Sequence, residues 1–481
     1  MTQHYPDIRF FVDGQWTLGN PAVTTFQNVV NPADETVLGR LPVANATITD
    51  AAIAAAHAAQ KAWRDTSPAR RAEVVQRASQ LLRERAATIA ALSSLEMGTP
   101  VKDTRNYALR AADIVEWDAA EARRLYGYVT PSEPGLRQMV VPEPVGPVAA
   151  FAPWNAPVLT PCRKIGSALA AGCTIIIKAA EETPACAMAV VQAFADAGAP
   201  PGTVNLLFGN PAQVSEQLIT APQIRMVTFT GSVPIGKHLA QLAAREMKPV
   251  LMELGGHAPV LICEDADIEQ AVTRCAPSKF RNGGQACIAP TRFFVHASVY
   301  EHFASAFVSA AKAFRIGDPF AEGVEIGPLA NPRRLNAIEA LVRDAAARGA
   351  RVLCGGHRLD RPGYFFAPTV LADIPSDARV LSEEPFGPVA CLIRYTDEEQ
   401  AVAQANALPY GLAGYVFTRD AARADRLSRA LECGAVAINH LVVSTSGIPF
   451  GGVKESGIGR EGGAQGVRSY TVDKTITHSH I

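Results

Sequence analysis

Five short apolar runs between residues 145 and 254, separated by helical stretches, constrain the fold most strongly. Their sequences are "GPVAAFAP", "CTIIIKAA", "TVNLLFG", "RMVTFTG" and "PVLMELGG", and each ends at glycine, proline or a polar turn. Helical stretches such as "PCRKIGSALAAG" and "TPACAMAVVQAFADAG" lie between them. Strands and helices that alternate in this way form a parallel sheet covered on both faces. We therefore expect an α/β fold.

The rest of the chain divides into further parts, as expected for 481 residues, which exceed one ordinary core. A helical, alanine-rich section begins at Thr47 and carries no catalytic pattern of its own. From about 257 to 450 a second α/β pattern follows, with strands at "APVLIC", "RFFVHA", "FFAPTVLAD", "VACLIRY" and "GAVAIN". The final "RSYTVDKTITHSHI" alternates like a strand with no neighbour in sequence, so we expect it to join another sheet. Residues 125–144 are the candidate partner.

Composition excludes several classes of protein. Forty-five Lys and Arg residues balance 46 Asp and Glu residues, so neither nucleic acid nor an anionic membrane is expected as the main partner. The nine cysteines are scattered without a C-x-x-C pair, which favours reduced thiols in the cytoplasm and gives no metal-ligand spacing. No secretory signal or bilayer-length apolar run is visible. We expect a cytoplasmic protein with no structural metal.

Ligands of parallel sheets bind beyond the carboxyl ends of the strands, so the polar residues there matter most. Gly231 and Gly236 of "FTGSVPIG" begin a helix whose N–H groups and Ser232 hydroxyl suit a phosphate, although a plain β-to-α turn would look the same. Lys178 and Glu181 suit the hydroxyls of a ribose, or are simply solvated. Glu253 ends an apolar run and is either a buried general base or a carboxylate that faces water.

Cys287 differs from the other eight cysteines in its surroundings. It lies in "RNGGQACIAPTR", where Gly283, Gly284 and Ala286 leave space and expose backbone N–H groups. A thiolate that attacks a carbonyl needs access and donors for the oxyanion that forms. The other cysteines lie in apolar runs or helices and are expected to be small buried hydrophobes. Cys287 is therefore the candidate nucleophile.

Seven motifs in order identify a family. "PWNAP", "KAAEETP", "FTGSVPIG", "MELGGHAP", "GGQAC", "EEPFGPV" and "PFGGVKESGIGRE" resemble the aldehyde dehydrogenase superfamily over essentially the whole chain, most of all its succinate-semialdehyde dehydrogenase branch. The resemblance implies a Rossmann-like cofactor-binding domain (1–121 and 145–254), an α/β catalytic domain (255–455) and a small β oligomerisation element (122–144 and 465–481). A homodimer or homotetramer is expected.

The resemblance also implies a role for each matching residue. Cys287 matches the nucleophile, Glu253 the general base, and Asn155 the amide of the oxyanion hole. Lys164 and Glu461 match a proton relay from the base. The cofactor-binding positions are Trp154, Lys178, Glu181, Gly231, Ser232, Gly236, Glu384 and Phe386. The implied reaction passes through a cysteine thiohemiacetal and a thioester, and a small-molecule aldehyde leaves as a carboxylic acid.

The choice of substrate and cofactor leaves alternatives open. Arg163 and Arg281 match arginines that hold the far carboxylate of succinate semialdehyde, and Thr445 lies near a hydroxyl of that branch. Ala156 widens the wall where an aromatic residue is common, so aliphatic or aromatic aldehydes remain the alternative. Glu181 favours NAD over NADP, since it would repel a 2′-phosphate. A CoA-acylating dehydrogenase or a non-catalytic binding protein is a weaker alternative, because Glu253, Cys287 and Asn155 are all present.

Overall fold

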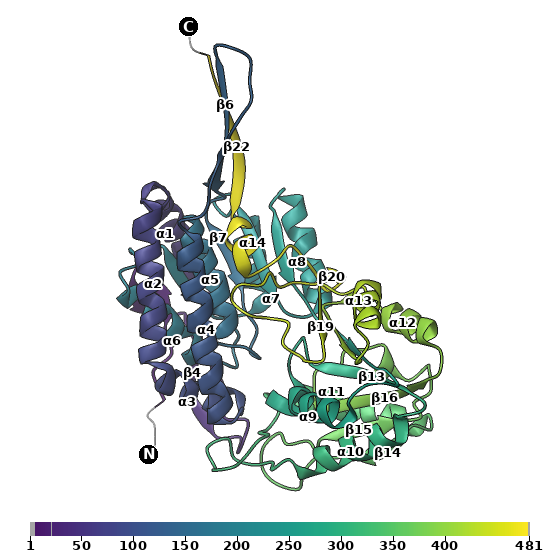
Figure 1. The fold of residues 1–481 in the computed structure, drawn as a ribbon. Coiled ribbons are helices and arrows are strands. Elements are labelled where there is room, and N and C mark those ends of the chain that lie inside the picture. Colours follow the sequence, from purple (N-terminus) through teal and green to yellow (C-terminus); the bar gives the residue numbers. More distant parts are fainter. Residues whose placement is uncertain (1–4, 21, 480–481) are drawn as a thin grey trace.

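The computed structural model describes residues 5–20 and 22–479, which form two α/β sheets and a projecting arm (Figure 1). The first sheet contains all five runs predicted between 145 and 254. Its eight strands are, in spatial order, β2 (Gln15–Thr17), β1 (Phe10–Val12), β9 (Val204–Leu207), β8 (Ile175–Lys178), β7 (Val148–Phe151), β10 (Met226–Thr230), β11 (Val250–Glu253) and β21 (Gly457–Ile458). The five central strands, from β9 to β11, are parallel, as predicted.

The order of these parallel strands indicates where a crevice for a ligand lies. The chain runs outward from β7 through β8 to β9, then returns to the other side of β7 for β10 and β11. The direction of winding therefore reverses between β7 and β10. At such a switch point the connections leave the two strands in opposite directions and open a crevice beyond their carboxyl ends. Asn155 follows β7 and Ser232 follows β10, so the fold brings these two residues to one crevice.

Helices cover this sheet in layers. The connecting helices pack as two groups, α5 with α6 and α7 with α8, on either side of the strands (Figure 1). Their bounds, with those of the N-terminal helices, are α1 (Ala46–Asp65), α2 (Pro68–Glu84), α3 (Ala86–Met97), α4 (Val101–Glu121), α5 (Leu159–Ala171), α6 (Pro184–Asp196), α7 (Pro211–Thr220) and α8 (Val233–Arg245). Helix α4 packs along α5, which places one face of α4 near the crevice.

The second sheet follows from residue 258 and is parallel except for one edge strand. Its order is β14 (Arg351–Cys354), β15 (Thr369–Ala372), β16 (Val389–Tyr395), β13 (Pro290–His296), β12 (Ala258–Ile262), β18 (Ala413–Phe417) and β19 (Ala435–Ile438). Its helices are α9 (Ile268–Phe280), α10 (Tyr300–Ala313), α11 (Pro332–Ala347), α12 (Glu398–Asn406) and α13 (Ala421–Ala430). The five predicted strands are present, and β14 and β18 are additional.

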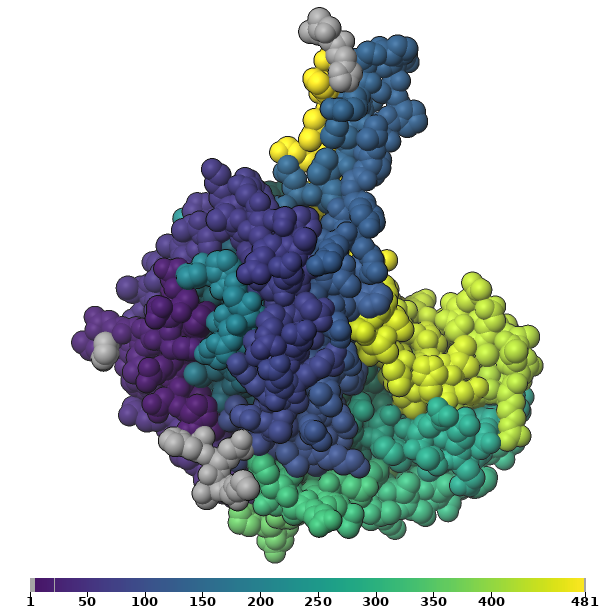
Figure 2. Space-filling view, turned by 60° about the vertical axis from the view of Figure 1, so that its left-hand side comes forward, coloured from purple at the N-terminus to yellow at the C-terminus, as the bar shows by residue number. Residues whose placement is uncertain are grey.

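The arm is a three-stranded antiparallel sheet that stands away from the body (Figure 2). It consists of β5 (Tyr128–Thr130), β6 (Leu136–Pro144) and β22 (Thr471–Ser479). The predicted pairing of the terminal strand with 125–144 is confirmed, with Lys474 opposite Val141. Residues 465–470, expected in this element, instead belong to α14 (Gly463–Arg468) and the turn after it. Val467 and Tyr470 are buried in the core of the first sheet, which holds this segment in the body.

The remaining elements are small. They are β3 (Thr25–Val30), β4 (Val37–Val43), β17 (Tyr410–Gly411), β20 (Val453–Lys454) and the 3-10 helices η1 (Arg281–Gly284) and η2 (Arg379–Leu381). All nine cysteines are free thiols. Within residues 5–20 and 22–479, no helix combines the length and the apolar character needed to span a bilayer.

Candidate active site

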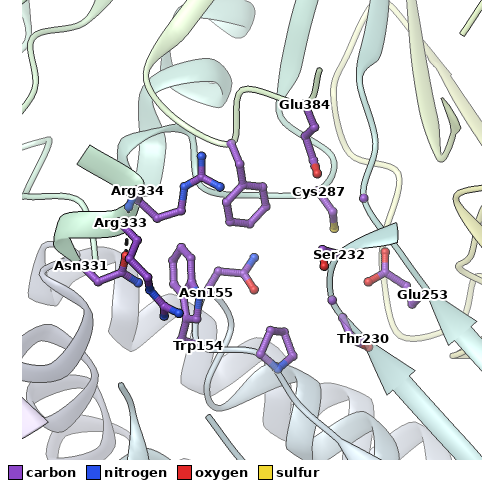
Figure 3. Close-up of a pocket in the computed structure, with 14 residues that line it drawn as sticks. Trp154, Asn155, Thr230, Ser232, Glu253, Cys287, Asn331, Arg333, Arg334 and Glu384 are labelled. Atoms are coloured by element: carbon purple, nitrogen blue, oxygen red, sulfur yellow. Dashed lines mark hydrogen bonds between the residues drawn. The ribbon is translucent and has the colours of Figure 1, made fainter. Parts of the chain in front are cut away.

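A pocket of about 370 Å³ lies at the switch point, and residues from segments that adjoin both sheets line it (Figure 3). We call it the cysteine pocket, since Cys287 lines it. The other residues that line it are Pro153, Trp154, Asn155, Thr230, Gly231, Ser232, Glu253, Gly255, Asn331, Arg333, Arg334, Glu384 and Phe386. Eight of the residues predicted from the sequence to be catalytic or to bind the cofactor therefore lie in one cavity.

The loop before Cys287 has an unusual backbone. Asn282, Gly283 and Gly284 have φ values of 54°, 58° and 71°, so three successive residues are left-handed. A Cβ atom on Gly284 would lie 2.2 Å from the carbonyl oxygen of Gly387, so only glycine fits there. The turn leaves Cys287 partly exposed at the pocket. Strained backbone of this kind is typical of functional sites.

Buried amides hold Asn155 beside this loop. The Asn155 Nδ2 atom donates to the carbonyl of Gln285 at 3.1 Å, and Asn282 Nδ2 donates to the carbonyls of Asn155 and Gln285 at 3.3 and 3.2 Å. One of the two Nδ2 hydrogens of Asn155 is thereby used, and the other is available to a ligand. The sequence motifs did not single out Asn282 or Gln285. The one feature of the sequence that could have indicated them is that two amide residues stand beside the glycines of "RNGGQAC".

Cys287 and Glu253 both line the cysteine pocket, and burial raises the pKa of each. Burial, and then the charge of Glu461, raises the pKa of Glu253 to about 8. Burial, and then the charges of Glu253 and Glu384, raises the pKa of the Cys287 thiol well above its usual value. The Oε1 atom of Glu253 is buried without a hydrogen-bond partner among the described residues. When Glu253 is ionised it can take the proton of the Cys287 thiol, and the negative charge then moves from the carboxylate to the sulfur.

Lys164 and Glu461 form a buried ion pair next to this carboxyl group. The Lys164 Nζ atom lies 2.7 Å from Glu461 Oε1 and donates to Thr228 Oγ1 at 2.9 Å. Lys164 is fully buried, and its positive charge lowers the pKa of Glu253, whereas Glu461 raises it. The two residues come from α5 and from the segment before α14. The fold thus brings together the two residues assigned to a proton relay by resemblance.

The other side of the cysteine pocket suits a nicotinamide dinucleotide. The rings of Trp154 and Phe386 meet edge to face with centroids 5.5 Å apart. Glu384 Oε1 accepts from the backbone N–H of Gly256 at 3.0 Å, and burial raises the pKa of Glu384 to about 7. Ser232 precedes α8, and its hydroxyl forms no capping bond with the helix. A phosphate at this helix N-terminus would find free donors.

Gly236 packs closely against the first sheet. It does not line the cysteine pocket, and a Cβ atom there would lie 2.4 Å from Leu254 Cδ2. Glycine at this position lets α8 lie close to the strand that ends at Glu253. The predicted cofactor contact at Gly236 stays a prediction.

Lys178 and Glu181 lie outside the cysteine pocket. They form an ion pair with each other, and Glu181 also accepts from the backbone N–H of Gly209 at 3.4 Å. Glu181 lines a second cavity of about 600 Å³, which we call the glutamate pocket. Asn331 and Arg333 line both pockets and join them. A molecule long enough to occupy both would reach from Cys287 to Glu181.

A third cavity of about 120 Å³, the arginine pocket, also reaches Cys287 and shares Asn155 and Glu253 with the cysteine pocket. Arg163 and Arg281 both line it, as predicted for residues that hold the substrate. Thr445 is exposed and does not line it. The adjacent Ser444 does, and its hydroxyl accepts from Arg163 Nη2 at 2.6 Å. The hydroxyl in this pocket therefore comes from Ser444 and not from Thr445 as predicted, because the chain turns Ser444 inward and Thr445 outward.

Comparison with known proteins agrees with this geometry. The aldehyde dehydrogenase family model matches residues 16–476. The chain is 46% identical over 468 residues to the 4-(hydroxymethyl)benzenesulfonate dehydrogenase TsaD1 of Comamonas testosteroni, covering 97% of each. It is 40% identical over 460 residues to the NADP(+) succinate-semialdehyde dehydrogenase GabD of Escherichia coli K12, covering 95% of each. An NAD+ complex of aldehyde dehydrogenase from Bacillus cereus superposes with a TM-score of 0.96 at 32% identity, covering 99% of this chain and 97% of that one.

The fold and the site define an NAD(P)-dependent oxidoreductase with a cysteine at its centre. The chain belongs to the aldehyde dehydrogenase family, and it has the aldehyde dehydrogenase fold. The predicted family and fold class are confirmed.

The raised pKa of Glu253 predicts how the rate depends on pH. A carboxyl group accepts a proton only when ionised, so oxidation should become faster as pH rises from 6 to 9, with half the increase near pH 8. Steady-state kcat/KM across this range measures it. Glu253→Gln should lower the rate and remove that inflection. A profile that is flat or falls with pH in the unaltered enzyme would contradict the assignment.

Proposed function

We propose that this enzyme oxidises an aldehyde with a distal anionic group to the carboxylic acid, with NAD as the electron acceptor. The observation that supports it most is the meeting of Cys287, Asn155 and Glu253 in one pocket. Incubation with NAD and an aldehyde, without CoA, tests the reaction class: we expect reduced cofactor and carboxylic acid in equal amounts. Reduced cofactor that forms only when CoA is added, with an acyl-CoA thioester as the product, would favour the acylating alternative.

In the first step Cys287 is the nucleophile. The ionised form of Glu253 takes the thiol proton, and the sulfur, now a thiolate, attacks the carbonyl carbon of the aldehyde. The free Nδ2 hydrogen of Asn155 and the backbone N–H of Cys287 donate to the oxygen that becomes negative. One such donor lowers the barrier by about 3 kcal/mol. The backbone carbonyl of Gln285 accepts from the Asn155 side chain and holds it in place for this bond, and the Asn282 amide donates to the backbone carbonyl of Asn155.

The cofactor side of the cysteine pocket is assigned to Trp154, Gly231, Ser232, Glu384 and Phe386. A bound nicotinamide would take the hydrogen and its electron pair from the substrate carbon, which leaves a thioester on Cys287. Glu384 would accept from ribose hydroxyls, and Ser232 would donate to a phosphate. The aromatic pair of Trp154 and Phe386 would exclude water from the ring.

Hydrolysis of the thioester returns the enzyme to its starting state. Glu253, after its proton has left, takes a proton from a water molecule that attacks the thioester carbon. The Lys164–Glu461 pair lies next to Glu253 and would receive that proton in turn. Cys287 then leaves as thiolate and is protonated again. The carboxylic acid departs through the arginine pocket.

Two arginines support an anionic substrate. A guanidinium presents forked donors that suit a carboxylate or a sulfonate. Arg163 is buried with its Nη1 atom unbonded among the described residues, and Arg281 lies over the Tyr107 ring at 5.8 Å. One relative is described as acting on a benzenesulfonate and another on succinate semialdehyde, and both names include an anion. Succinate semialdehyde is thus a candidate, and Ala156 leaves room for larger ones.

Removal of Arg281 should separate charged from uncharged substrates. Arg281→Ala should raise KM for succinate semialdehyde by roughly tenfold or more, since a charge-assisted hydrogen bond is lost. KM for propanal should change much less. Arg274→Ala, an exposed arginine on α9, is the matched control and should leave both values unchanged. An equal effect of Arg281→Ala on both aldehydes would refute the anion site.

Glu181 is proposed to select NAD. Its carboxylate, paired with Lys178, would accept from a free 2′-hydroxyl and repel a 2′-phosphate. Glu181→Ser should shift the ratio of kcat/KM for NAD over NADP toward NADP by roughly tenfold. Glu216→Ser, an exposed glutamate on α7, should leave the ratio unchanged. A wild-type enzyme that prefers NADP would overturn this assignment.

The arm is proposed to bind a second copy of the chain. Both its faces are open to solvent, and Tyr128, Val129, Val472 and Ile476 are exposed on it. Burial of such side chains is the usual reason for assembly. We therefore assign 1–121 with 145–254 to the cofactor domain, 255–455 to the catalytic domain, and the arm to a homodimer or homotetramer. The free cysteines favour a reducing compartment, the cytoplasm.

A further inference from the structure

A third arginine faces the arginine pocket, and no sequence motif singled it out. Arg110 lies on α4 and lines the same cavity as Arg163 and Arg281. Its Nη2 atom donates to the carbonyl oxygen of Ser444 at 2.9 Å, while Arg163 donates to the hydroxyl of that residue. Arg281 stacks on Tyr107, which lies one helical turn before Arg110. Three guanidinium groups therefore meet around one end of the cavity.

No carboxylate forms an ion pair with any of the three in the part of the chain that the structure describes. Several acidic side chains lie nearby. Asp113 pairs with Arg83, and Asp103 lies near Arg281 on a partly exposed side of the helix. Asp118 lies near Arg163 and accepts a hydrogen bond from the Ser167 hydroxyl, and burial raises the pKa of Asp118. Glu253 and Glu461 also line the cavity, and Glu461 pairs with Lys164. The three guanidinium groups can therefore bind a further anionic group.

The three groups approach from different elements: Arg110 from α4, Arg163 from α5 and Arg281 from η1. A carboxylate offers two oxygens in one plane, which one forked guanidinium and the Ser444 hydroxyl can satisfy. A tetrahedral anion offers three oxygens that point in three directions. Each of these oxygens can accept from a separate arginine.

We propose that Arg110 completes a three-arginine subsite for a tetrahedral, three-oxygen anion on the substrate, a sulfonate or phosphonate, and selects it over a planar carboxylate. This rests on the proposed oxidation of an anionic aldehyde at Cys287. The wall between the subsite and Cys287 is apolar, with Ala156, Ile288 and Phe450 among its residues. Small and flat surfaces of this kind accommodate an aromatic ring, so an aryl aldehyde with the anion opposite the formyl group is the matching substrate class.

Kinetics of Arg110→Met test the subsite. The enzyme is assayed with 4-formylbenzenesulfonate, 4-formylbenzoate and 4-formylphenylphosphonate. Relative to the benzoate, kcat/KM for the sulfonate and the phosphonate should fall by about tenfold or more, the effect of one charge-assisted hydrogen bond. Arg105→Met, an exposed arginine on the same helix, is the matched control and should keep the wild-type ratios. An equal loss for all three substrates would mean that Arg110 only supports the Ser444 loop, and would overturn the proposal.

Comparison of the sulfonate with the phosphonate substrate separates recognition of the anion's shape from recognition of its charge. A similar loss for sulfonate and phosphonate supports recognition of three oxygens. A loss confined to the phosphonate, which carries more negative charge, would mean that Arg110 acts as a charge alone and would overturn the shape argument.

Binding without turnover separates this proposal from the proposed function. Calorimetric titration of the wild-type enzyme should give a lower Kd for benzenesulfonate than for benzoate, and Arg110→Met should remove the difference. If the enzyme oxidises no aldehyde yet shows this difference, the proposed reaction fails and the subsite stands. If aldehydes are oxidised but the two anions bind equally well in both proteins, the subsite fails and the reaction stands.

Discussion

The buried amide network of Asn155, Asn282 and Gln285 is the interaction on which the site depends. Asn155 follows a strand of the first sheet, whereas Asn282 and Gln285 precede a strand of the second. The network extends further, since Asn282 also bonds Thr99 and the backbone N–H of Ala330 donates to Gln285. Each buried polar group left without its partner would cost about 1–3 kcal/mol. The same bonds therefore join the two sheets and orient the amide proposed to hold the oxyanion.

Burial and neighbouring carboxylates raise the pKa of both the nucleophile and the base. Glu253 and Glu384 act in this way on Cys287, and Glu461 acts on Glu253. Lys164 pairs with Glu461, so the charge of that buried carboxylate is balanced locally. The guanidinium groups of Arg110, Arg163 and Arg281 line the arginine pocket, which also reaches Cys287. They would attract the anionic group of an aldehyde whose carbonyl carbon lies at the sulfur.

The sequence predicted most of what lies at strand ends. Asn155, Ser232 and Glu253 could be found because apolar runs mark β7, β10 and β11, and parallel strands present their carboxyl ends at one edge. Strand β18 was missed, because "AGYVF" is short and contains glycine. The register of the terminal strand on β6 was not predictable either, although its partner was.

Residues brought in by helix faces and loops could not be predicted from local patterns. Arg110 lies within an ordinary amphipathic helix, and only the packing of α4 on α5 turns it toward the pocket. Ser444 and Thr445 look alike in sequence, and the path of the loop decides which hydroxyl is inside. The close packing of Gly236 against Leu254 could not be predicted either, since it depends on how α8 lies on the sheet.

A covalent bond between the Cys287 sulfur and the substrate carbonyl carbon is the central claim. Mass spectrometry of the unaltered enzyme, quenched rapidly in acid after mixing with NAD and aldehyde, measures it most directly, since Glu253 is then present for the attack and the thioester is trapped before it hydrolyses. The account predicts an acyl mass increment on the peptide that contains Cys287 and no increment without NAD. Formation of reduced cofactor with every cysteine-containing peptide left at its unmodified mass would contradict it.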